Sequence, residues 1–527
     1  MAILDAATAT VAELRDALAA GSLSAAAVVG AYLARIEAYD RSPSGLAAVR
    51  AVNPNARDIA ARLDARRRAG AERRPLDGIP ILLKDNIATG DAQYTTAGSL
   101  ALAGARAARD ATIVRELRRA GAVILGKANL TEFANMMAID MPAGYSSLGG
   151  QVRNPYAPAV DGRGVPIVSP GGSSAGSAVA VAAGLCAAAI GTETSGSLLS
   201  PASQTGLVTV KPTVGLVSRA GILPIAHSQD TAGPLTRTVR DAAILLNVLA
   251  APDPRDAETR HIRRPADFTA SLDPDGLRAA RIGVPSDPAD PANDLYYGPL
   301  PASAAAVMRR AIAAIEALGA RIVRANIATA SWIAGHGSEI SILNRNPESP
   351  GRDLLVRRSI VLVYELKHDL NRYLRDWATE TEIKSLADII AFNVAQRGRA
   401  LRFGQDIFVA AEATRGDLAE PEYRAARRLD LLAARSLGLD AHMDRYRLDA
   451  LLFPAAAGAS IAAKAGFPSV QVPAGFVGGD ETPPYPFGAT FTGRAWSEAT
   501  LLRFAYAFEQ ATSARRPPPG LPPLDEQ

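Results

Sequence analysis

The sequence predicts an α/β fold in which helices flank a buried sheet, and three observations predict it. Short apolar runs bounded by Pro, Gly or Asp, such as I-P-I-L-L-K at residues 79–84, have the length and character of buried strands. Segments with helical periodicity alternate with these runs along the first half of the chain. Of the 527 residues 48% are hydrophobic and only 5% aromatic, which favours a large core of Ala, Leu, Val and Ile.

Two amphipathic helices are expected first. Thr10 is followed three residues later by Glu13, which is the pattern of a capping box at a helix start. A break at Gly21 separates this helix from a second one that spans residues 24–39. A buried strand then ends near Lys84, and a helix over residues 110–120 precedes a second buried strand at 122–125.

The middle of the chain is dominated by small residues. Residues 175–189 predict a helix that must be buried, because it has no polar face. Residues 191–196 are expected to form a loop, and Ser200-Pro201 to start the next element. Strand character returns at residues 450–454 and 468–473.

The long segment between these regions is expected to shape the pocket. Residues 252–300 are rich in Pro and Asp and predict a surface connection, and the chain is then mostly helical to about residue 450. We interpret 255–450 as a variable, mostly helical insertion within one unit that spans 1–527. The Pro-rich stretch 516–527 is expected to be a loosely attached tail.

Composition limits the partners and the compartment. The formal net charge of +4 gives little reason to expect a nucleic-acid partner, and the Arg66–Arg68 run fits the solvated end of a surface helix. The single cysteine, Cys186, lies in an apolar segment and fits a small buried hydrophobe in a reducing compartment. The N-terminus lacks a secretory pattern, and no apolar run is long enough to span a membrane. We therefore expect a cytoplasmic protein without a membrane partner.

One glycine-lysine segment resembles a phosphate-binding loop but lacks its chemistry. Gly121-A-V-I-L-Gly126-Lys127 is followed by Ala128, so there is no hydroxyl for magnesium, and the residues between the glycines predict an apolar strand. The chain also has no H-E-x-x-H pattern and no cysteine cluster. We expect neither a metal nor any other cofactor.

A second motif is a real alternative for catalysis. Gly172-Ser173-Ser174-Ala175-Gly176 fits G-x-S-x-G, in which Ser174 would be the nucleophile and a later acid and histidine would complete a triad. The five histidines are His227, His261, His336, His368 and His442. None lies in a convincing strand-end loop near an aspartate.

Three other residues supply a different nucleophilic site. Ser173 and Ser197 lie 24 positions apart in glycine-rich turns, and Lys84 ends an apolar run. Lysine can take a proton from serine only when it is neutral. Lowering its pKa from about 10.4 to about 7.5 costs roughly 4 kcal/mol, which only a buried site imposes. The alternative for Lys84 is a strand-end lysine that extends to solvent.

The motifs together resemble the amidase signature family. They are P-L-D-G-I-P-I-L-L-K-D-N, G-K-A-N-L-T-E-F-A, P-G-G-S-S-A-G-S-A, G-T-E-T-S-G-S-L-L-S-P-A, G-L-V-T-V-K-P-T-V-G-L-V-S and A-G-F-P-S-V-Q-V-P-A-G, and they extend over nearly the whole chain. The segments at 215–234 and 495–510 look most like the peptide amidase branch. The resemblance implies one compact α/β unit with a mixed central sheet flanked by helices.

The resemblance also implies a role for each matching residue. Ser197 corresponds to the acylated nucleophile, Ser173 to a bridging serine after a cis peptide bond, and Lys84 to the general base. The backbone N–H groups of Thr194, Ser195, Gly196 and Ser197 correspond to the oxyanion hole.

The chain departs from the family pattern near this site. Ala175-Gly176 stands where the family usually has a glycine pair, and Ser195 replaces a common glycine. Residues 156–169 are longer than expected and are a candidate pocket wall. Residues 135–145 are further candidates for lining the pocket.

The predicted function is hydrolysis of amide bonds, including C-terminal peptide amides, through a Ser-Ser-Lys triad and an acyl-enzyme. Two alternatives remain open within the family: a hydrolase of carbamates (a urethanase), aryl amides or esters, and an amidotransferase component that modifies charged tRNA. A catalytically dead binding protein is a third. The expected partner is a small amide or peptide-amide substrate, and the sequence leaves the oligomeric state open.

Overall fold

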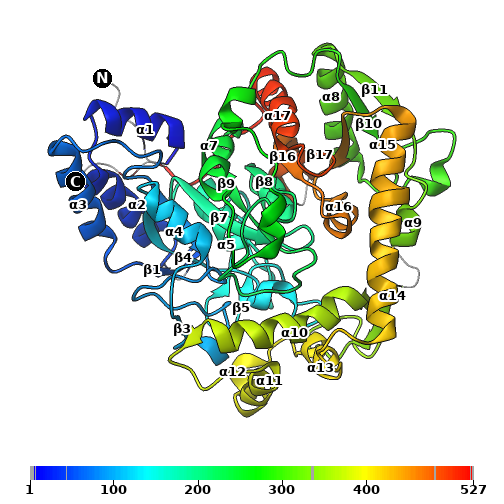
Figure 1. Cartoon of the computed structure of the whole chain (residues 1–527), viewed down its shortest axis with the longest axis horizontal. Helices are drawn as coiled ribbons and strands as arrows, with labels where there is room; N and C mark the ends of the chain where they lie inside the picture. The colour runs from blue at the N-terminus through cyan, green and yellow to red at the C-terminus, as the bar shows by residue number, and fades with distance from the viewer. Residues whose placement is uncertain are drawn as a thin grey trace.

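An eleven-stranded mixed sheet lies at the centre of the computed structural model and confirms the predicted fold class (Figure 1). The structure describes residues 5, 7–42, 44–333, 338–479, 482–522 and 524. The strands lie in the order β1-β4-β2-β7-β9-β8-β16-β17-β15-β10-β11. Their bounds are β1 Val49–Val52, β2 Pro80–Lys84, β4 Val123–Ala128, β7 Ala188–Glu193, β8 Val208–Lys211, β9 Thr231–Thr236, β10 Arg281–Val284, β11 Arg321–Arg324, β15 Ala450–Pro454, β16 Ser469–Gly479 and β17 Thr482–Thr492.

The sheet is parallel where the site forms. β2 pairs in parallel with both β4 and β7, whereas β1, β8, β9, β16 and β17 pair in antiparallel fashion. At the far edge β10 pairs in parallel with β15 and β11. Three two-stranded sheets complete the strands: β3 Arg106–Ala107 with β14 Ala378–Thr379, β5 Tyr145–Ser146 with β6 Gly150–Gln151, and β12 Glu339–Leu343 with β13 Leu355–Ser359.

Helices flank the sheet and also form a separate group. In Figure 1, α10 to α13 run along the lower edge and α14 and α15 along the right edge. The helices are α1 Val11–Ala20, α2 Ala25–Tyr39, α3 Ala56–Arg68, α4 Thr112–Arg119, α5 Ala175–Ala182, α6 Leu199–Gln204, α7 Val239–Leu249, α8 Ala302–Ala317, α9 Ala330–Ile333, α10 Ile360–Asp376, α11 Leu386–Ala395, α12 Arg397–Ala400, α13 Asp406–Glu412, α14 Pro421–Asp430, α15 Ala441–Tyr446, α16 Ala459–Ala465 and α17 Glu498–Thr512. Shorter helical turns are η1 Leu100–Leu102, η2 Glu132–Asn135, η3 Ala257–His261, η4 Phe268–Ser271 and η5 Pro291–Asn293, and η6 Leu431–Asp440 joins α14 to α15.

The N-terminal elements form as predicted. The Thr10 hydroxyl accepts the N–H of Glu13, and the Glu13 carboxylate accepts the N–H of Thr10, which completes the capping box. The Ser24 side chain caps α2 by accepting the N–H of Ala27. None of the helices in the described part of the chain has the length and apolar character needed to cross a membrane.

The predicted helix at 175–189 is too long. α5 ends at Ala182, Gly184 adopts a positive φ of 68°, and Ala188 starts strand β7. The first half of the expected 191–196 loop therefore belongs to that strand. A run of small residues is compatible with either a helix or a strand, and the pairing of β7 with β2 and β9 decides the outcome.

The region after residue 252 holds more sheet than expected. β10 lies inside the stretch predicted to be a surface connection, and together with β11 it extends the central sheet. The sequence predicts a mostly helical stretch from 300 to about 450. Residues 360–446 are mostly helical, whereas β11, β12 and β13 lie in the part before residue 360. The boundaries 255–450 of a variable insertion stay a prediction.

The expectation of a loose C-terminal tail is wrong for the part that the structure describes. Arg35 and Tyr39 of α2 both donate hydrogen bonds to the carbonyl of Pro522, at 2.8 Å each. Tyr156 donates to the carbonyl of Arg516 at 2.5 Å. The proline-rich chain offers few N–H donors, so donors from the body of the protein hold its carbonyl groups instead.

Candidate active site

Lys84 lies at the carboxyl end of β2, in the interior of the central sheet. Every residue of β2 is buried, because β4 and β7 pair with it on both sides. β2 and β7 are parallel, so their carboxyl ends meet at one edge of the sheet. This arrangement brings Thr192 of β7 beside Lys84.

The ammonium group of Lys84 is surrounded by oxygen atoms. Lys84 Nζ donates to Ser173 Oγ at 2.7 Å, to Ser174 Oγ at 3.0 Å and to Thr192 Oγ1 at 2.9 Å. The carbonyl of Thr192 accepts a further bond at 3.2 Å. The side chain is fully buried, so the alternative of a lysine that extends to solvent is excluded.

Burial changes the acidity of this lysine. Desolvation lowers the pKa of Lys84 to about 7, against the charges of Asp230 and Glu193, which act to raise it. No carboxylate forms an ion pair with Lys84 among the described residues. The Lys84 amine is therefore neutral in a large fraction of the protein molecules near neutral pH. A neutral amine can accept a proton from a hydroxyl.

Glycines bring the two serine-bearing loops together. Gly171 and Gly172, with φ of 77° and 20°, turn the chain just before Ser173. A Cβ on Gly172 would lie 3.0 Å from the Cα of Ser197, so only glycine permits this approach. The N–H of Ser174 donates to the carbonyl of Ser197 at 3.2 Å. The expected cis bond between Gly172 and Ser173 is wrong, since the described chain has no cis peptide bond and the two glycines make the turn instead.

Ser197 is half-buried and has a free hydroxyl. In the described part of the chain its Oγ makes no hydrogen bond, either with Ser173 or with another residue. The structure thus brings Lys84 and Ser173 into direct contact and places Ser197 in the adjoining loop.

The loop in front of Ser197 presents unused donors. The backbone N–H groups of Thr194, Ser195, Gly196 and Ser197 find no acceptor among the described residues. The next two N–H groups, of Leu198 and Leu199, donate to the buried carboxylate of Glu193 at 2.6 and 3.0 Å. Consecutive free N–H groups at the start of a helix can bind an oxygen that carries negative charge.

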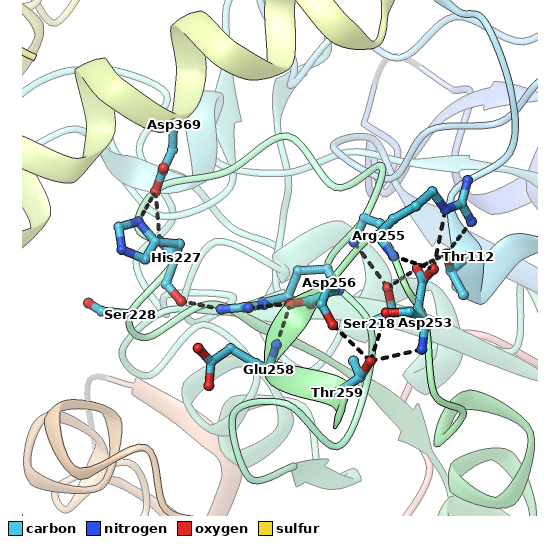
Figure 2. Close-up of polar contacts among 12 residues, drawn as sticks. Thr112, Ser218, His227, Ser228, Asp253, Arg255, Asp256, Glu258, Thr259 and Asp369 are labelled. Carbon is cyan, nitrogen blue, oxygen red and sulfur yellow. Dashed lines mark hydrogen bonds and ion pairs between the residues drawn. The ribbon is translucent and has the colours of Figure 1, made fainter. Parts of the chain in front are cut away.

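A cavity of about 550 Å³ adjoins this centre. Asn86, Thr192 and Thr194 form its inner wall, and neither Ser173 nor Ser197 lines it. The wall opposite comes from loop residues 219–231, from 254–258 around the start of η3 and from α10. Figure 2 shows the polar contacts that hold this wall together, in which Asp253 accepts hydrogen bonds from Ser218 and Arg255.

Two buried polar atoms on the cavity wall have no partner. They are Asn86 Oδ1 and Thr231 Oγ1, both among the described residues. The amide nitrogen of Asn86 donates to Thr192 Oγ1 at 3.1 Å, which fixes the side chain and leaves its oxygen as an acceptor. A buried acceptor without a donor is a place where a ligand or water binds.

The segments considered as alternatives have other roles. Lys127 is buried and donates to the carbonyl of Ile87 and, at 2.9 Å, to Thr95 Oγ1, so its segment is a strand and not a phosphate loop. Ser174 Oγ contacts Lys84 and Thr192, and no histidine contacts it in the described part of the chain. His336 lies outside the described residues.

The two segments expected to line the pocket, 156–169 and 135–145, do not line the cavity beside Lys84. Residues 156–169 do not line the described cavity, and Arg163 instead donates to the carbonyl of Glu348 at 3.2 Å. From 135–145, Tyr145 lines a second, separate cavity with Arg402 and Glu348. Residues 255–258 and α10, which line the first cavity, belong to the 255–450 segment that the sequence predicts to shape the pocket, whereas the wall residues between 219 and 231 are not among those predicted.

Comparison with known proteins decides the family. The model of the Amidase family matches residues 27–502. The chain belongs to the amidase family. A probable amidase of Arabidopsis thaliana is 37% identical over 448 residues, which cover 84% of this chain and 78% of that protein. A glutamyl-tRNA(Gln) amidotransferase subunit from Symbiobacterium thermophilum is 33% identical over 97% of this chain and 98% of its own length.

A solved structure of the family is similar over the whole fold. The native peptide amidase of Stenotrophomonas maltophilia has a TM-score of 0.83 and 42% identity, with 97% of this chain and 98% of that chain covered. This amidase-family chain is accordingly a hydrolase of carbon–nitrogen bonds.

The sequence motifs contain some of the residues around Lys84 and Ser197 but do not show how these residues contact one another. Asn86 follows Lys84 in K-D-N, and Asp230 lies in S-Q-D-T, so both stand inside matching segments. Their contacts with Thr192 and Thr194 depend on loops that pack across the sheet edge. No local pattern marks Thr192 as a partner of Lys84.

Proposed function

We propose that the protein hydrolyses small carboxamides, including C-terminal peptide amides, through an acyl-enzyme on Ser197. The observation that carries this proposal is the contact between Lys84 Nζ and Ser173 Oγ at 2.7 Å, together with a Lys84 pKa of about 7. A base with a pKa near the working pH is the most effective proton acceptor.

The proposed reaction uses these residues in sequence. Neutral Lys84 accepts the proton of Ser173, and Ser173 takes the proton of Ser197 as Ser197 Oγ bonds to the substrate carbonyl carbon. The free N–H groups of residues 194–197 bind the oxyanion. The same relay returns the proton to the leaving nitrogen as the C–N bond breaks. Water then attacks the ester, and the acid leaves with Ser197 restored.

Two features support a carboxamide as substrate. Asn86 Oδ1 is a buried acceptor without a partner on the cavity wall, and an amide N–H is the donor that such an atom lacks. The 42% identical peptide amidase relative has been solved in complex with the competitive inhibitor chymostatin. We infer peptide amides as the first substrates to test.

A second candidate is a component of a tRNA-dependent amidotransferase. The 33% identity to the glutamyl-tRNA(Gln) amidotransferase chain of Symbiobacterium thermophilum, over nearly the full length of both chains, favours it. That reaction transfers ammonia to an activated acyl group, so the isolated chain would show little turnover of simple amides. Carbamates, aryl amides and esters remain alternatives, because the same site attacks any of these carbonyl groups.

The test compares substrates and then removes the nucleophile. Peptide amides, anilides, carbamates and esters are assayed side by side, with release of ammonia or amine measured directly. We expect Ser197→Ala to lose about a thousandfold or more in kcat/KM. A serine-reactive fluorophosphonate should label Ser197, as mapped by mass spectrometry.

The matched control is Ser200→Ala, which changes a half-buried serine in α6 and leaves the three residues of the relay intact. Lys84→Met should lose about 10²- to 10⁴-fold. Turnover retained in Ser197→Ala, or labelling of Ser174 in place of Ser197, contradicts the mechanism. A wild type that hydrolyses none of these substrates favours the amidotransferase alternative.

A further inference from the structure

Three residues of α10 and one histidine from a loop converge beside the far wall of the cavity, which two of them, His227 and Asp369, line. Glu365, His368 and Asp369 stand at positions i, i+3 and i+4, so they share one face of the helix. Figure 2 shows His227 directed at Asp369 from the facing loop. The sequence pattern Glu-x-x-His is one by which helices bind metal ions.

Both imidazoles are held by a single carboxylate. His227 Nδ1 lies 2.8 Å from Asp369 Oδ2, and His368 Nδ1 lies 2.8 Å from Asp369 Oδ1. One ligand atom from each of these three residues lies within 4.8 Å of the other two. Glu365 Oε2 is 3.5 Å from His227 Nδ1 and adds a second negative charge at the same place.

The backbone holds this cluster in position. The N–H of His227 donates to Asp369 at 2.7 Å, and the N–H of Ser228 donates to the buried carboxylate of Glu365 at 3.0 Å. Asp369 is buried, whereas the side chains of His227 and His368 are 46% and 35% exposed. The carboxylate is therefore fixed, and the two rings can turn.

The nearby positive charge of Arg219 opposes the binding of a metal ion only weakly. Arg219 donates to the backbone carbonyl of His227, but its guanidinium is paired with Asp256 through Nη2 at 2.5 Å and Nε at 2.8 Å. Its charge is largely neutralised there. The two carboxylates and two imidazoles leave the cluster negative when the histidines are neutral.

We propose that His227, His368 and Asp369 bind a divalent transition-metal ion, for which Zn²⁺ is the best match. Two imidazoles and one carboxylate form a ligand set typical of zinc, with a fourth position left for water. Ligand atoms around tetrahedral zinc lie about 3.3 Å apart, because each bond is about 2.0–2.1 Å long. Rotation of the two partly exposed rings closes the remaining gap.

The site has a consequence for turnover. His227 and Asp369 line the same cavity as Thr192 and Thr194. A bound ion with its water would occupy part of this space, so we infer that zinc inhibits hydrolysis reversibly. This regulatory part rests on the proposed function, whereas the binding of the ion does not.

Calorimetry tests the binding without any substrate. The full-length protein, freed of metal with EDTA and dialysed, is titrated with ZnCl₂, and we expect one equivalent to bind. His227→Ala and His368→Ala should each weaken binding at least tenfold. The matched control is His261→Ala, an exposed histidine of η3 outside the cluster, which should bind zinc as the wild type does. The absorption of Co²⁺ bound in place of Zn²⁺ gives a second reading of imidazole ligation.

The possible results test the zinc site and the inhibition of hydrolysis by zinc separately. No binding by the wild type, or equal binding by the wild type and by His227→Ala and His368→Ala, overturns the site. Zinc should lower carboxamide turnover, EDTA should restore it, and His368→Ala should resist inhibition relative to its own metal-free rate. Binding without inhibition overturns the regulatory part alone. A wild type without carboxamide activity refutes the proposed function and leaves the calorimetric result to decide the site.

Discussion

Thr194 donates its hydroxyl hydrogen to Asp230 Oδ1 over 2.5 Å and so ties the loop in front of Ser197 to residues 225–230. Asp230 Oδ2 accepts the N–H groups of Ile225 and Ala226 at 2.8 and 2.9 Å. Desolvation raises the pKa of Asp230 to about 6. Its negative charge in turn raises the pKa of Lys84. One carboxylate thus holds the loop in front of Ser197 and raises the pKa of Lys84.

The pH dependence of activity should report on this pair. Wild-type kcat/KM should rise through about pH 7, because Lys84 acts only after it loses its proton. In Asp230→Asn the neighbouring negative charge is gone, so the pKa of Lys84 falls further and the midpoint moves to lower pH. The measurement is kcat/KM for one peptide amide between about pH 5 and 9.

The control for this shift is Asp376→Asn, which removes an exposed carboxylate from the same cavity wall. The charge of Asp376 is not among those that act on Lys84. The midpoint of the pH profile of Asp376→Asn should therefore match that of the wild type. An Asp230→Asn midpoint that stays in place or moves to higher pH contradicts the coupling.

Replacing Lys84 should change how stability depends on pH. Folding lowers the pKa of Lys84 from 10.5 to about 7, so the unfolded chain binds more protons between these values and wild-type stability rises with pH there. Below about pH 7 the full cost of the buried charge remains, at most about 5 kcal/mol at 1.36 kcal/mol per unit. Lys84→Met removes this cost.

The free energy of unfolding of Lys84→Met minus that of the wild type should therefore have its largest positive value near about pH 6 and should decrease toward about pH 10. Urea unfolding of both proteins at several pH values measures this difference. Lys384→Met, which replaces an exposed lysine, should show no such trend. A Lys84→Met difference that is independent of pH would refute the lowered pKa.

Ser174 should act by positioning Lys84 rather than as a nucleophile. Its hydroxyl accepts from Lys84 at 3.0 Å and donates to the carbonyl of Thr192 at 2.9 Å. Ser174→Ala should lower kcat/KM by about ten- to a hundredfold, less than Ser173→Ala, which breaks the relay and should lose about 10²- to 10⁴-fold. Fluorophosphonate labelling should persist in Ser174→Ala. Loss of that label would restore the G-x-S-x-G alternative.

Gly176 should be required for stability because of where α5 packs. A Cβ at this position would lie 2.2 Å from the carbonyl oxygen of Asn129 and 2.6 Å from that of Ala48. Both contacts are with backbone atoms, which cannot turn away, so Gly176→Ala should destabilise by about 2 kcal/mol or more. Gly162→Ala meets nothing within 4 Å and should change stability by less than about 1 kcal/mol. Equal urea midpoints for the two variants would show that α5 packs differently.

Local patterns predicted the elements best where one conformation was clearly favoured. The Thr10 capping box, the Ser24 cap and the apolar run that ends at Lys84 all form as expected. The small-residue run failed at Ala182, because alanine and glycine fit a helix and a buried strand equally well. β10 was missed because its flanking Pro and Asp residues obscure a four-residue strand.

The sequence by itself determined that an apolar strand carries Lys84 at its end, and its motifs identified the family and the two serines. Only the tertiary structure decided that Lys84 is covered and which atoms it meets. Thr192 contacts Lys84 from 108 residues away, and His227 reaches Asp369 across 142 residues. Periodicity and capping act within a few residues, whereas these contacts depend on how strands pair and how loops cross the sheet edge.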